Sequence, residues 1–290
     1  MLKKSTSRKI FEIFNTLFMI AFSAITLYPF LYVLAASLSS DEFFLSGNFG
    51  IIPDGINFDA YKAVLSYPML GRSYLNTILY TVVGTAINLV LTILGAYPLA
   101  RKDLKGKKLI TFLIVFTMFF SGGLIPNYLV VQKTGLYDTF WAMVIPNAIA
   151  TWNLILMRTY FQSIPAEIEE AALIDGYGYF SILVKIIVPL SVPSIATVGL
   201  FYAVAHWNSY FNALLYLQSK ELYPVQILLR QIVIQNSTDD ITNSATMGGV
   251  MFAENIKYAT IIITALPIIC VYPFIQKYFI KGIMVGSVKG

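Results

Sequence analysis

The residues of this chain whose types and spacing could do chemistry gather in one segment, Ser163–Pro189. The segment holds four acids, Glu167, Glu169, Glu170 and Asp175, and it contains neither histidine nor cysteine. Without such neighbours these carboxylates have no partner for metal binding by mixed ligands or for an activated nucleophile. They can instead accept charge-assisted hydrogen bonds from a basic group on another protein. The chemistry that we expect is therefore recognition, with Glu170 as a contact.

The same segment has the pattern of two short helices joined at a glycine. Ser163 is expected to cap the first helix, and Pro165 suits its first turn. The glutamates then lie near the positive end of that helix, where acids are favoured. Gly176 suits the helix end. A second, apolar helix is expected over Tyr179–Ile187, before Pro189 leads into the next apolar stretch.

Two roles fit this helix–glycine–helix segment. In the first, it docks into a cleft of a partner protein: Ala171 and Ala172 permit close backbone approach, while Phe180 and Leu183 fill an apolar groove. In the second, it rests on the lipid surface as an interfacial or re-entrant hairpin. These residues taken alone leave both roles open.

Other chemistry finds little support in the chain. The single cysteine, Cys270, and the single histidine, His206, have no cluster of possible ligands around them, so we expect no metal site, no disulfide and no catalytic residue. The sequence has no phosphate-binding Gly-x4-Gly-Lys-Ser/Thr loop, so the chain is expected neither to bind ATP nor to be an enzyme.

The elements that must position this segment are membrane-spanning helices. The chain is 57% hydrophobic and 12% charged, whereas a soluble domain is about 25% charged. Six apolar stretches reach the roughly 20 residues that a helix needs to cross a bilayer: Phe11–Ser37, Tyr74–Leu99, Leu109–Val130, Thr139–Tyr160, Leu190–Ala213 and Lys257–Ile280. We expect an all-α, polytopic membrane protein with one transmembrane domain over residues 1–290, its first stretch an uncleaved anchor.

Basic residues indicate the orientation of these spans. With the N-terminus inside, fourteen Lys and Arg residues fall on the cytoplasmic side and six outside, which favours cytoplasmic termini. This placement accounts for the net charge of +5 without a nucleic acid partner. It puts residues 163–189 in the cytoplasm and makes residues 214–255 a long extracytoplasmic loop, while a short outer helix is expected from Asp59.

The cytoplasmic segment resembles the EAA docking motif of binding-protein-dependent ABC importer permeases. That motif reads Glu-Ala-Ala, three residues, Gly, nine residues, then Ile-x-Leu-Pro. This chain has Glu170-Ala171-Ala172, then Gly176, then Ile186-x-Val188-Pro189, with Val188 in place of leucine. The match favours docking over an interfacial hairpin.

Further residues resemble the carbohydrate branch of that family, typified by the smaller maltose permease. They include the outer turn Gly135–Thr139, the pair Trp207-Asn208, the run Ala96–Arg101 and the ending Lys281–Gly290. Within the branch, the chain looks most similar to permeases for oligosaccharides and polysaccharide fragments, including the alginate-oligosaccharide type.

The resemblance implies a type I ABC importer permease fold in the bacterial cytoplasmic membrane. It implies a second, homologous permease as partner, an extracytoplasmic solute-binding protein, and two ATPase subunits that bind the ATP and Mg. The implied contacts to the ATPase are Glu170, Ala171, Ala172, Asp175, Gly176, Ile186 and Pro189. ATPase closure around ATP would then rock the spans and open the path outward.

Polar and aromatic residues in or near the spans are candidates for contact with a sugar: Asn76, Asn88, Trp207, Asn208, Tyr210 and Asn212. Each has a structural alternative, because aromatic residues at span ends anchor the interface and asparagines bond neighbouring helices. The family holds its sugar mainly on the other permease. In the outer loop, Asn236, Ser237 and Asn243 are candidates for contact with the binding protein.

Three alternatives stay open at this point. An amino-acid or peptide permease would share the docking motif. An ion-coupled secondary carrier would need an intramembrane ionisable group, and His206 is the one residue that could serve. A membrane-embedded enzyme would need a constellation of catalytic side chains that the sequence does not offer.

Overall fold

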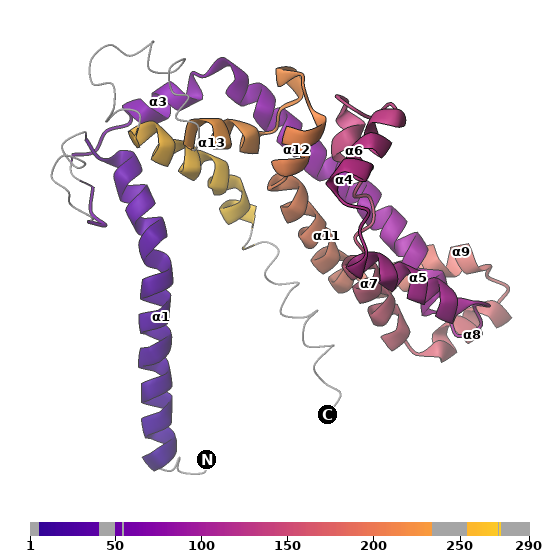
Figure 1. Ribbon diagram of the computed structural model, residues 1–290. Coiled ribbons are helices and arrows are strands. Elements are labelled where there is room, and N and C mark those ends of the chain that lie inside the picture. Colours follow the sequence, from indigo (N-terminus) through magenta and orange to yellow (C-terminus); the bar gives the residue numbers. More distant parts are fainter. Residues whose placement is uncertain (1–5, 41–49, 54, 234–253, 272, 274–290) are drawn as a thin grey trace. The chain divides into compact units, whose positions relative to one another are not determined.

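The computed structural model describes residues 6–40, 50–53, 55–233, 254–271 and 273, and every regular element in this part is a helix (Figure 1). The expectation of an all-α chain is therefore confirmed. The described residues form two compact units. The first takes the chain up to Leu70 and Leu229–Leu266, and the second takes Gly71–Leu228 and the residues from Pro267.

The first unit contains α1 (Thr6–Leu38), a helix whose apolar side chains are exposed along most of its length. Its last turn is tied to α3 (Asp59–Leu65), which confirms the short helix expected from Asp59. The hydroxyls of Ser37 and Tyr61 lie 2.7 Å apart, and the Asn57 amide donates to the Leu38 carbonyl at 2.7 Å. Such an apolar surface is suited to lipid or to another membrane protein.

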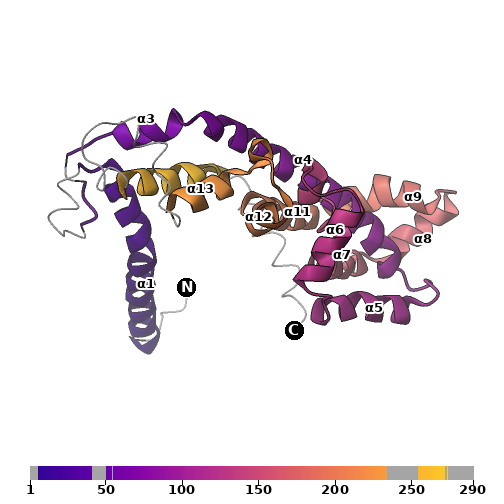
Figure 2. The same ribbon diagram turned by 45° about the horizontal axis from the view of Figure 1, so that its top comes forward.

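The second unit begins with the long helix α4 (Pro68–Ala100), and shorter helices follow it. They are α5 (Lys107–Phe119), α6 (Leu124–Lys133), η1 (Phe140–Met143), α7 (Thr151–Ser163), α8 (Ala166–Ile174), α9 (Tyr179–Ile182), η2 (Leu183–Ile187), α10 (Val188–Leu190), α11 (Val192–Trp207), α12 (Phe211–Tyr216), η3 (Lys220–Leu222) and α13 (Val225–Val233), whose residues after Leu228 belong to the first unit. In this unit α7 packs against both α5 and α11 (Figure 2).

The expected spans are found with different degrees of regularity. By length and composition, Ser7–Leu38, Pro68–Ala100 and Glu254–Val271 are each able to cross a membrane. The stretch Leu109–Val130 is not one helix: α5 and α6 meet at 112°, because the chain between them passes through Gly123 at a φ of 92°. The stretch Thr139–Tyr160 is also broken, between η1 and α7. The number of spans and their orientation stay predictions.

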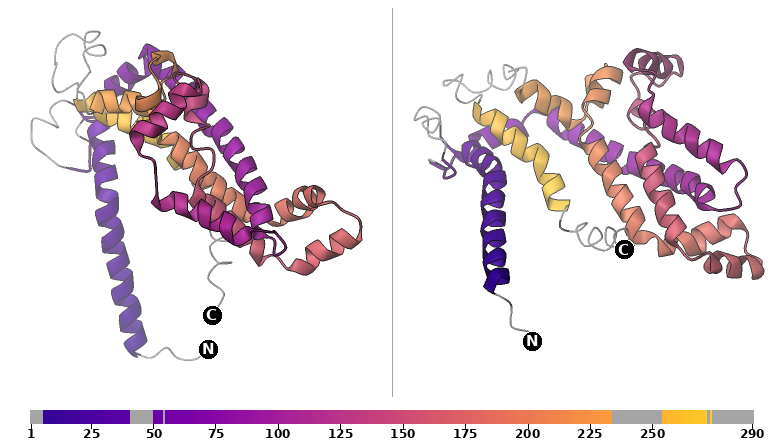
Figure 3. Two further views of the ribbon diagram at one scale, coloured as in Figure 1. Left: turned by 45° about the vertical axis from the view of Figure 1, so that its right-hand side comes forward. Right: turned by 60° about the horizontal axis from the view of Figure 1, so that its bottom comes forward.

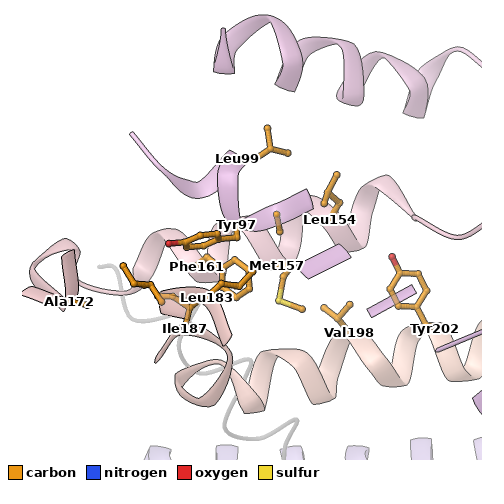
Figure 4. Close-up of a cluster of buried hydrophobic side chains, with 12 residues drawn as sticks. Tyr97, Leu99, Leu154, Met157, Phe161, Ala172, Leu183, Ile187, Val198 and Tyr202 are labelled. Carbon is orange, nitrogen blue, oxygen red and sulfur yellow. The ribbon is translucent and has the colours of Figure 1, made fainter. Parts of the chain in front are cut away.

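The core of the second unit joins the spans to the segment that follows them. Figure 4 shows Tyr97 and Leu99 of α4, Leu154, Met157 and Phe161 of α7, and Val198 and Tyr202 of α11 gathered with Leu183, Ile187 and Ala172. Met157 and Val198 are fully buried. This shared core therefore connects the segment after α7 to α4, α7 and α11.

Helices α4 and α11 also meet around a small residue and a polar network. The imidazole of His206 lies directly over Gly84, so closely that a Cβ atom at position 84 would overlap it. Beside it, His206 Nε2 lies 3.4 Å from Asn88 Oδ1, and the hydroxyls of Thr92 and Tyr202 lie 2.7 Å apart. A small residue that allows close approach, with polar side chains bonded across helices, is the usual packing of membrane helices.

This contact predicts the effect of a single methyl group. Gly84→Ala should lower the thermal stability of the full-length protein by about 1–3 kcal/mol, the range for overpacking a close contact. Gly71→Ala, which lies in the same helix and has open space around its Cβ, is the matched control and should not destabilise. Adding His206→Ala to Gly84→Ala should restore most of the loss. Equal melting temperatures for Gly84→Ala and Gly71→Ala would contradict the close contact between Gly84 and His206.

Candidate functional site

The segment after α7 forms a helical hairpin that projects beyond the ends of α4 and α11 (Figures 2 and 3). Its first arm, α8, ends as the sequence predicts. Gly176 has a φ of 84°, its amide donates to the Leu173 carbonyl, and the Tyr177 amide donates to the Ala172 carbonyl. This pair of bonds is the Schellman motif, which glycine favours because it has no Cβ.

The start of α8 differs from the prediction. Ser163 does not cap it, because α7 continues through Ser163, whose hydroxyl donates to the Tyr160 carbonyl at 2.7 Å. Pro165 occupies the N-cap position, with no hydrogen bond from a capping side chain. Pro165 disfavours a helical conformation for the residue before it, so Ile164 is extended and separates the two helices.

The second arm runs from Tyr179 to Leu190 as α9, the wider π-helical turn η2 and α10. The predicted apolar helix over Tyr179–Ile187 is thus confirmed. The wide turn ends two residues before Pro189, which cannot donate a backbone hydrogen bond and whose ring crowds the preceding turn.

The hairpin sorts its residues between the core and the surface. Ala172, Leu183 and Ile187 are buried in the core of the unit, and Ile186 is half-buried. The other motif residues are exposed: Glu170, Ala171, Asp175, Gly176 and Pro189. The expectation that Leu183 contacts a partner is wrong, because its side chain already packs against α7. Two apolar side chains are strongly exposed instead, Ile174 at 87% and Phe180 at 71%.

An ion-pair cluster attaches this hairpin to the end of α4. Arg101 pairs with Glu169 of α8, and its guanidinium lies 3.9 Å from the ring centroid of Tyr179 on α9. The Tyr97 hydroxyl donates to the same Glu169 oxygen at 2.8 Å. Arg101 also makes a two-point contact with Asp103, at 2.9 and 2.8 Å. One residue thus joins both arms of the hairpin to a single span.

Arg101 and Asp103 stabilise each other's charge. The hydrogen bond from Arg101 lowers the pKa of the Asp103 carboxyl, and the hydrogen bond to Asp103 raises the pKa of Arg101. A cavity of about 480 Å³ lies between the end of α4 and the hairpin, with Arg101, Lys102, Glu169 and Glu170 in its lining. Charged side chains of both signs therefore line this cavity.

Sequence reasoning missed this cluster. In the sequence, Tyr97 and Arg101 stand out only as part of the run Ala96–Arg101, which resembles the carbohydrate branch of the permease family. Glu169 stands out only as one of several acids near the start of a helix. Tyr97 and Arg101 are four residues apart, a spacing that predicts one shared face on a continuous helix, although α4 ends at Ala100. That spacing indicates a pair on one helix but does not name its partner on another.

Four of the six residues expected to contact a sugar bond or pack against other parts of the chain. Asn76 donates to the carbonyls of Glu221 and Tyr223, and Asn88 donates to the carbonyl of Asn147 at 3.2 Å, so both amides bond within the chain. Trp207 packs edge-on against Tyr74. Asn208 donates to the Val204 carbonyl of its own helix. Tyr210 is exposed, and Asn212 is half-buried.

Asp138 fastens the turn after α6 to the chain after α12. Its Oδ1 accepts from the amides of Gln218 and Ser219, both at 2.8 Å, and its Oδ2 accepts from the Ser219 hydroxyl at 2.6 Å. Burial raises the pKa of Asp138, but these hydrogen bonds outweigh it and leave the pKa below its usual value. The outer-loop candidates Asn236, Ser237 and Asn243 lie outside the described residues.

These features define the class of the protein: a polytopic helical membrane protein that presents a charged helical hairpin beyond its spans, with no cluster of metal-ligating side chains among the described residues. That is the class of transport permeases. The chain belongs to the family described as "Binding-protein-dependent transport system inner membrane component", whose sequence model matches residues 1–285. It is thus an inner-membrane component of a transport system that works with a binding protein.

Known proteins similar over the whole length agree with this. The polygalacturonan/rhamnogalacturonan transport system permease protein YtcP of Bacillus subtilis is 44% identical over 284 residues, covering 97% of this chain and 99% of that protein. The protein LplC of the same organism is 45% identical over 282 residues, covering 97% and 96%. A chain from the crystal structure of a bacterial ABC transporter involved in the import of the acidic polysaccharide alginate is 35% identical, with a TM-score of 0.87 over 96% of this chain and 100% of that one. The type I importer permease fold is therefore confirmed.

Glu169 and Glu170 are neighbours in α8, but Glu169 is paired with Arg101 whereas Glu170 is exposed. Their substitution should therefore affect the stability of the protein differently. Glu169→Gln should lower the thermal stability of the full-length protein, because it removes one charge of a partly buried pair and weakens the contact with Arg101. Glu170→Gln, the matched control, should leave the melting temperature unchanged, since its side chain is exposed. If Glu170→Gln proves the more destabilising change, the assignment of the inner and outer faces of α8 is wrong.

The Asp138 contacts predict a pH-dependent stability. Because the folded pKa is lowered, the carboxylate contributes stability at pH values above its unfolded pKa of about 3.9, and this contribution is lost as the pH falls through the folded pKa. At pH 7, Asp138→Asn should cost about 1–3 kcal/mol, as for hydrogen bonds to a charged group. The melting-temperature difference from wild type should shrink near and below pH 4.

Asp59→Asn serves as the control for that experiment. Asp59 is exposed and contacts Lys62 three residues along the same helix at 3.0 Å, so its loss should change stability by less than about 1 kcal/mol. A pH-independent difference between wild type and Asp138→Asn would contradict the role of the Asp138 charge.

Proposed function

We propose that this chain is the permease subunit of an ATP-driven importer for carbohydrate, with oligosaccharides derived from acidic polysaccharides as the substrate class. The observation that carries the proposal is similarity over nearly the whole chain to two proteins named for such cargo, a polygalacturonan/rhamnogalacturonan permease at 44% identity and an alginate importer chain at 35% identity. Both polymers are rich in sugar carboxylates, so one substrate class accounts for both.

The exposed face of the α8–α9 hairpin is where we place the partner ATPase. Glu170 and Asp175 offer charge to a basic group, and Phe180 and Ile174 offer apolar area for a groove. Ala171 and Gly176 keep the backbone accessible, while Ala172, Ile186 and Pro189 fix the shape of the hairpin. ATP and Mg²⁺ are bound by that partner, in two copies, and not by this chain.

The Arg101 cluster gives the hairpin a route to the spans. When the ATPase dimer closes around ATP, it displaces the hairpin, and the contacts of Arg101 with Glu169 and Tyr179 carry the displacement to α4. The packed core of α4, α7 and α11 then moves as a body. With a second, homologous permease, this rocking exposes the path alternately to the two sides.

On the outer side, the binding protein delivers the sugar to this pair of permeases. We place its contact on the loop that contains Asn236, Ser237 and Asn243. Of the residues first considered for the path, Trp207, Asn208, Tyr210 and Asn212 stay candidates for direct contact. Asn76 and Asn88 act through the segments that they bond.

Reconstitution with the second permease, the ATPase and the binding protein tests the proposal. Uptake of short oligogalacturonides or oligoalginates into vesicles should require ATP, and Glu170→Gln or Gly176→Ala should reduce it at least tenfold while the ATPase still turns over. Glu167→Gln, an exposed acid in the same helix, is the control and should transport normally. Gly176→Ala acts because its φ of 84° is disfavoured for a residue with a Cβ.

Two results would contradict the proposal. If both hairpin variants transport at the wild-type rate, the hairpin is not the site of coupling. If uptake proceeds without ATP on an ion gradient and is abolished by His206→Ala, the chain is a secondary carrier. Binding of amino acids or peptides, but no sugar, by the partner binding protein would assign a different cargo to the same machinery.

A further inference from the structure

The chain has a non-helical break, Val144–Ala150, between η1 and α7. Within the break, backbone hydrogen bonds are few: the Val144 and Ile145 amides donate to the Trp141 carbonyl, and the Ala148 amide donates to the Ile145 carbonyl. Pro146 cannot donate, and the amides of Asn147 and Ile149 have no hydrogen-bond acceptor in the described part of the chain. A segment of this kind is unusual in the middle of a predicted span.

Its neighbours place the break deep in the membrane. The Asn147 carbonyl accepts from Asn88 at 3.2 Å, and the Ala150 amide donates to the Tyr202 hydroxyl at 3.1 Å. Asn88 lies in the continuous helix α4, about 18 Å before its end at Ala100, at about 1.5 Å per residue. Basic residues follow Ala100 directly, which marks the membrane surface there. In a hydrocarbon core about 30 Å thick, Asn88 and the break are near mid-depth.

The break is also open on one side. Val144 is fully buried, whereas Ile149 is 45% exposed and Asn147 and Ala150 are exposed as well. Lipid cannot cover this side, because an unpaired amide in hydrocarbon costs several kcal/mol. Exposed irregular backbone at membrane depth is tolerated where it lines a water-filled cavity.

We infer that the open side of Val144–Ala150 lines the substrate path of the permease and binds sugar hydroxyls through its free backbone amides and the Asn147 side chain. The inference rests on the proposed function, since it names the contact surface for that substrate class. Sugar hydroxyls replace water at such amides without loss of hydrogen bonds. Ile145 and Ile149 offer apolar contact to the C–H faces of a sugar ring. Asn88 and Tyr202 hold the break in place from behind.

Cysteine accessibility tests the inference in the complete transporter. With the only native cysteine removed by Cys270→Ala, single substitutions Ile145→Cys and Ile149→Cys should react with a charged, membrane-impermeant methanethiosulfonate. We expect the reaction with the methanethiosulfonate in at least one of two states, the resting complex or the complex trapped with ATP and vanadate. Reaction should stop uptake, and binding protein loaded with trigalacturonate should slow it severalfold. Both positions are partly exposed, so the substitutions should fold.

Val144→Cys is the matched control. The side chain at this position is fully buried, so it should react at least tenfold more slowly. Absence of reaction at both 145 and 149 in both states overturns the inference, because the break is then sealed by lipid or by the partner permease. Reaction only with an uncharged, lipid-soluble maleimide overturns it as well. Sugar uptake by the unmodified transporter is measured separately, so that the two proposals can fail independently. Labelling at these positions without sugar uptake would refute the proposed cargo but not the path. Sugar uptake without labelling would refute the path but not the cargo.

Discussion

The contact of Arg101 with Glu169 and Tyr179 is the interaction on which the functional site depends. A helical hairpin of this size is too short to hold a fixed position alone, and most of its partner-facing residues are exposed. Arg101 joins both of its arms to the end of α4, while Ala172, Leu183 and Ile187 pack into the core. The planar guanidinium suits this role because it can bind a carboxylate and stack on a ring at once.

Helix α4 connects this site to the interior of the membrane. Its C-terminal end carries Tyr97 and leads directly into Arg101, and its middle carries Thr92, Asn88 and Gly84, which contact α11 and the break before α7. Polar side chains at membrane depth are costly unless they are bonded, and here they satisfy the backbone of a broken helix. The same helix therefore contacts the hairpin at one end and the break Val144–Ala150 in its middle.

Much of the architecture could be predicted from the sequence, because membrane helices need long apolar runs and glycine marks the end of α8 at Gly176. The bend between α5 and α6 and the interruption before α7 could not, since hydropathy is the same for a straight and a broken span. The motif predicts where the hairpin lies in the chain, but it does not predict which residues of the hairpin are exposed. In the structure the Leu183 side chain is buried and Glu169 pairs with Arg101. Those outcomes depend on contacts between residues about 70 positions apart, for which local spacing carries no signal.

The most direct test of the central claim, that the outer face of the α8–α9 hairpin contacts the ATPase, is cross-linking in the assembled transporter. Phe180→Cys and Leu183→Cys, each in the Cys270→Ala chain, would be paired with single cysteines along the cleft of the ATPase. Disulfide formation at position 180 and not at 183, with a yield that changes on ATP binding, is the predicted result. Efficient cross-linking at 183, or none at 180 with any ATPase position, would contradict the account.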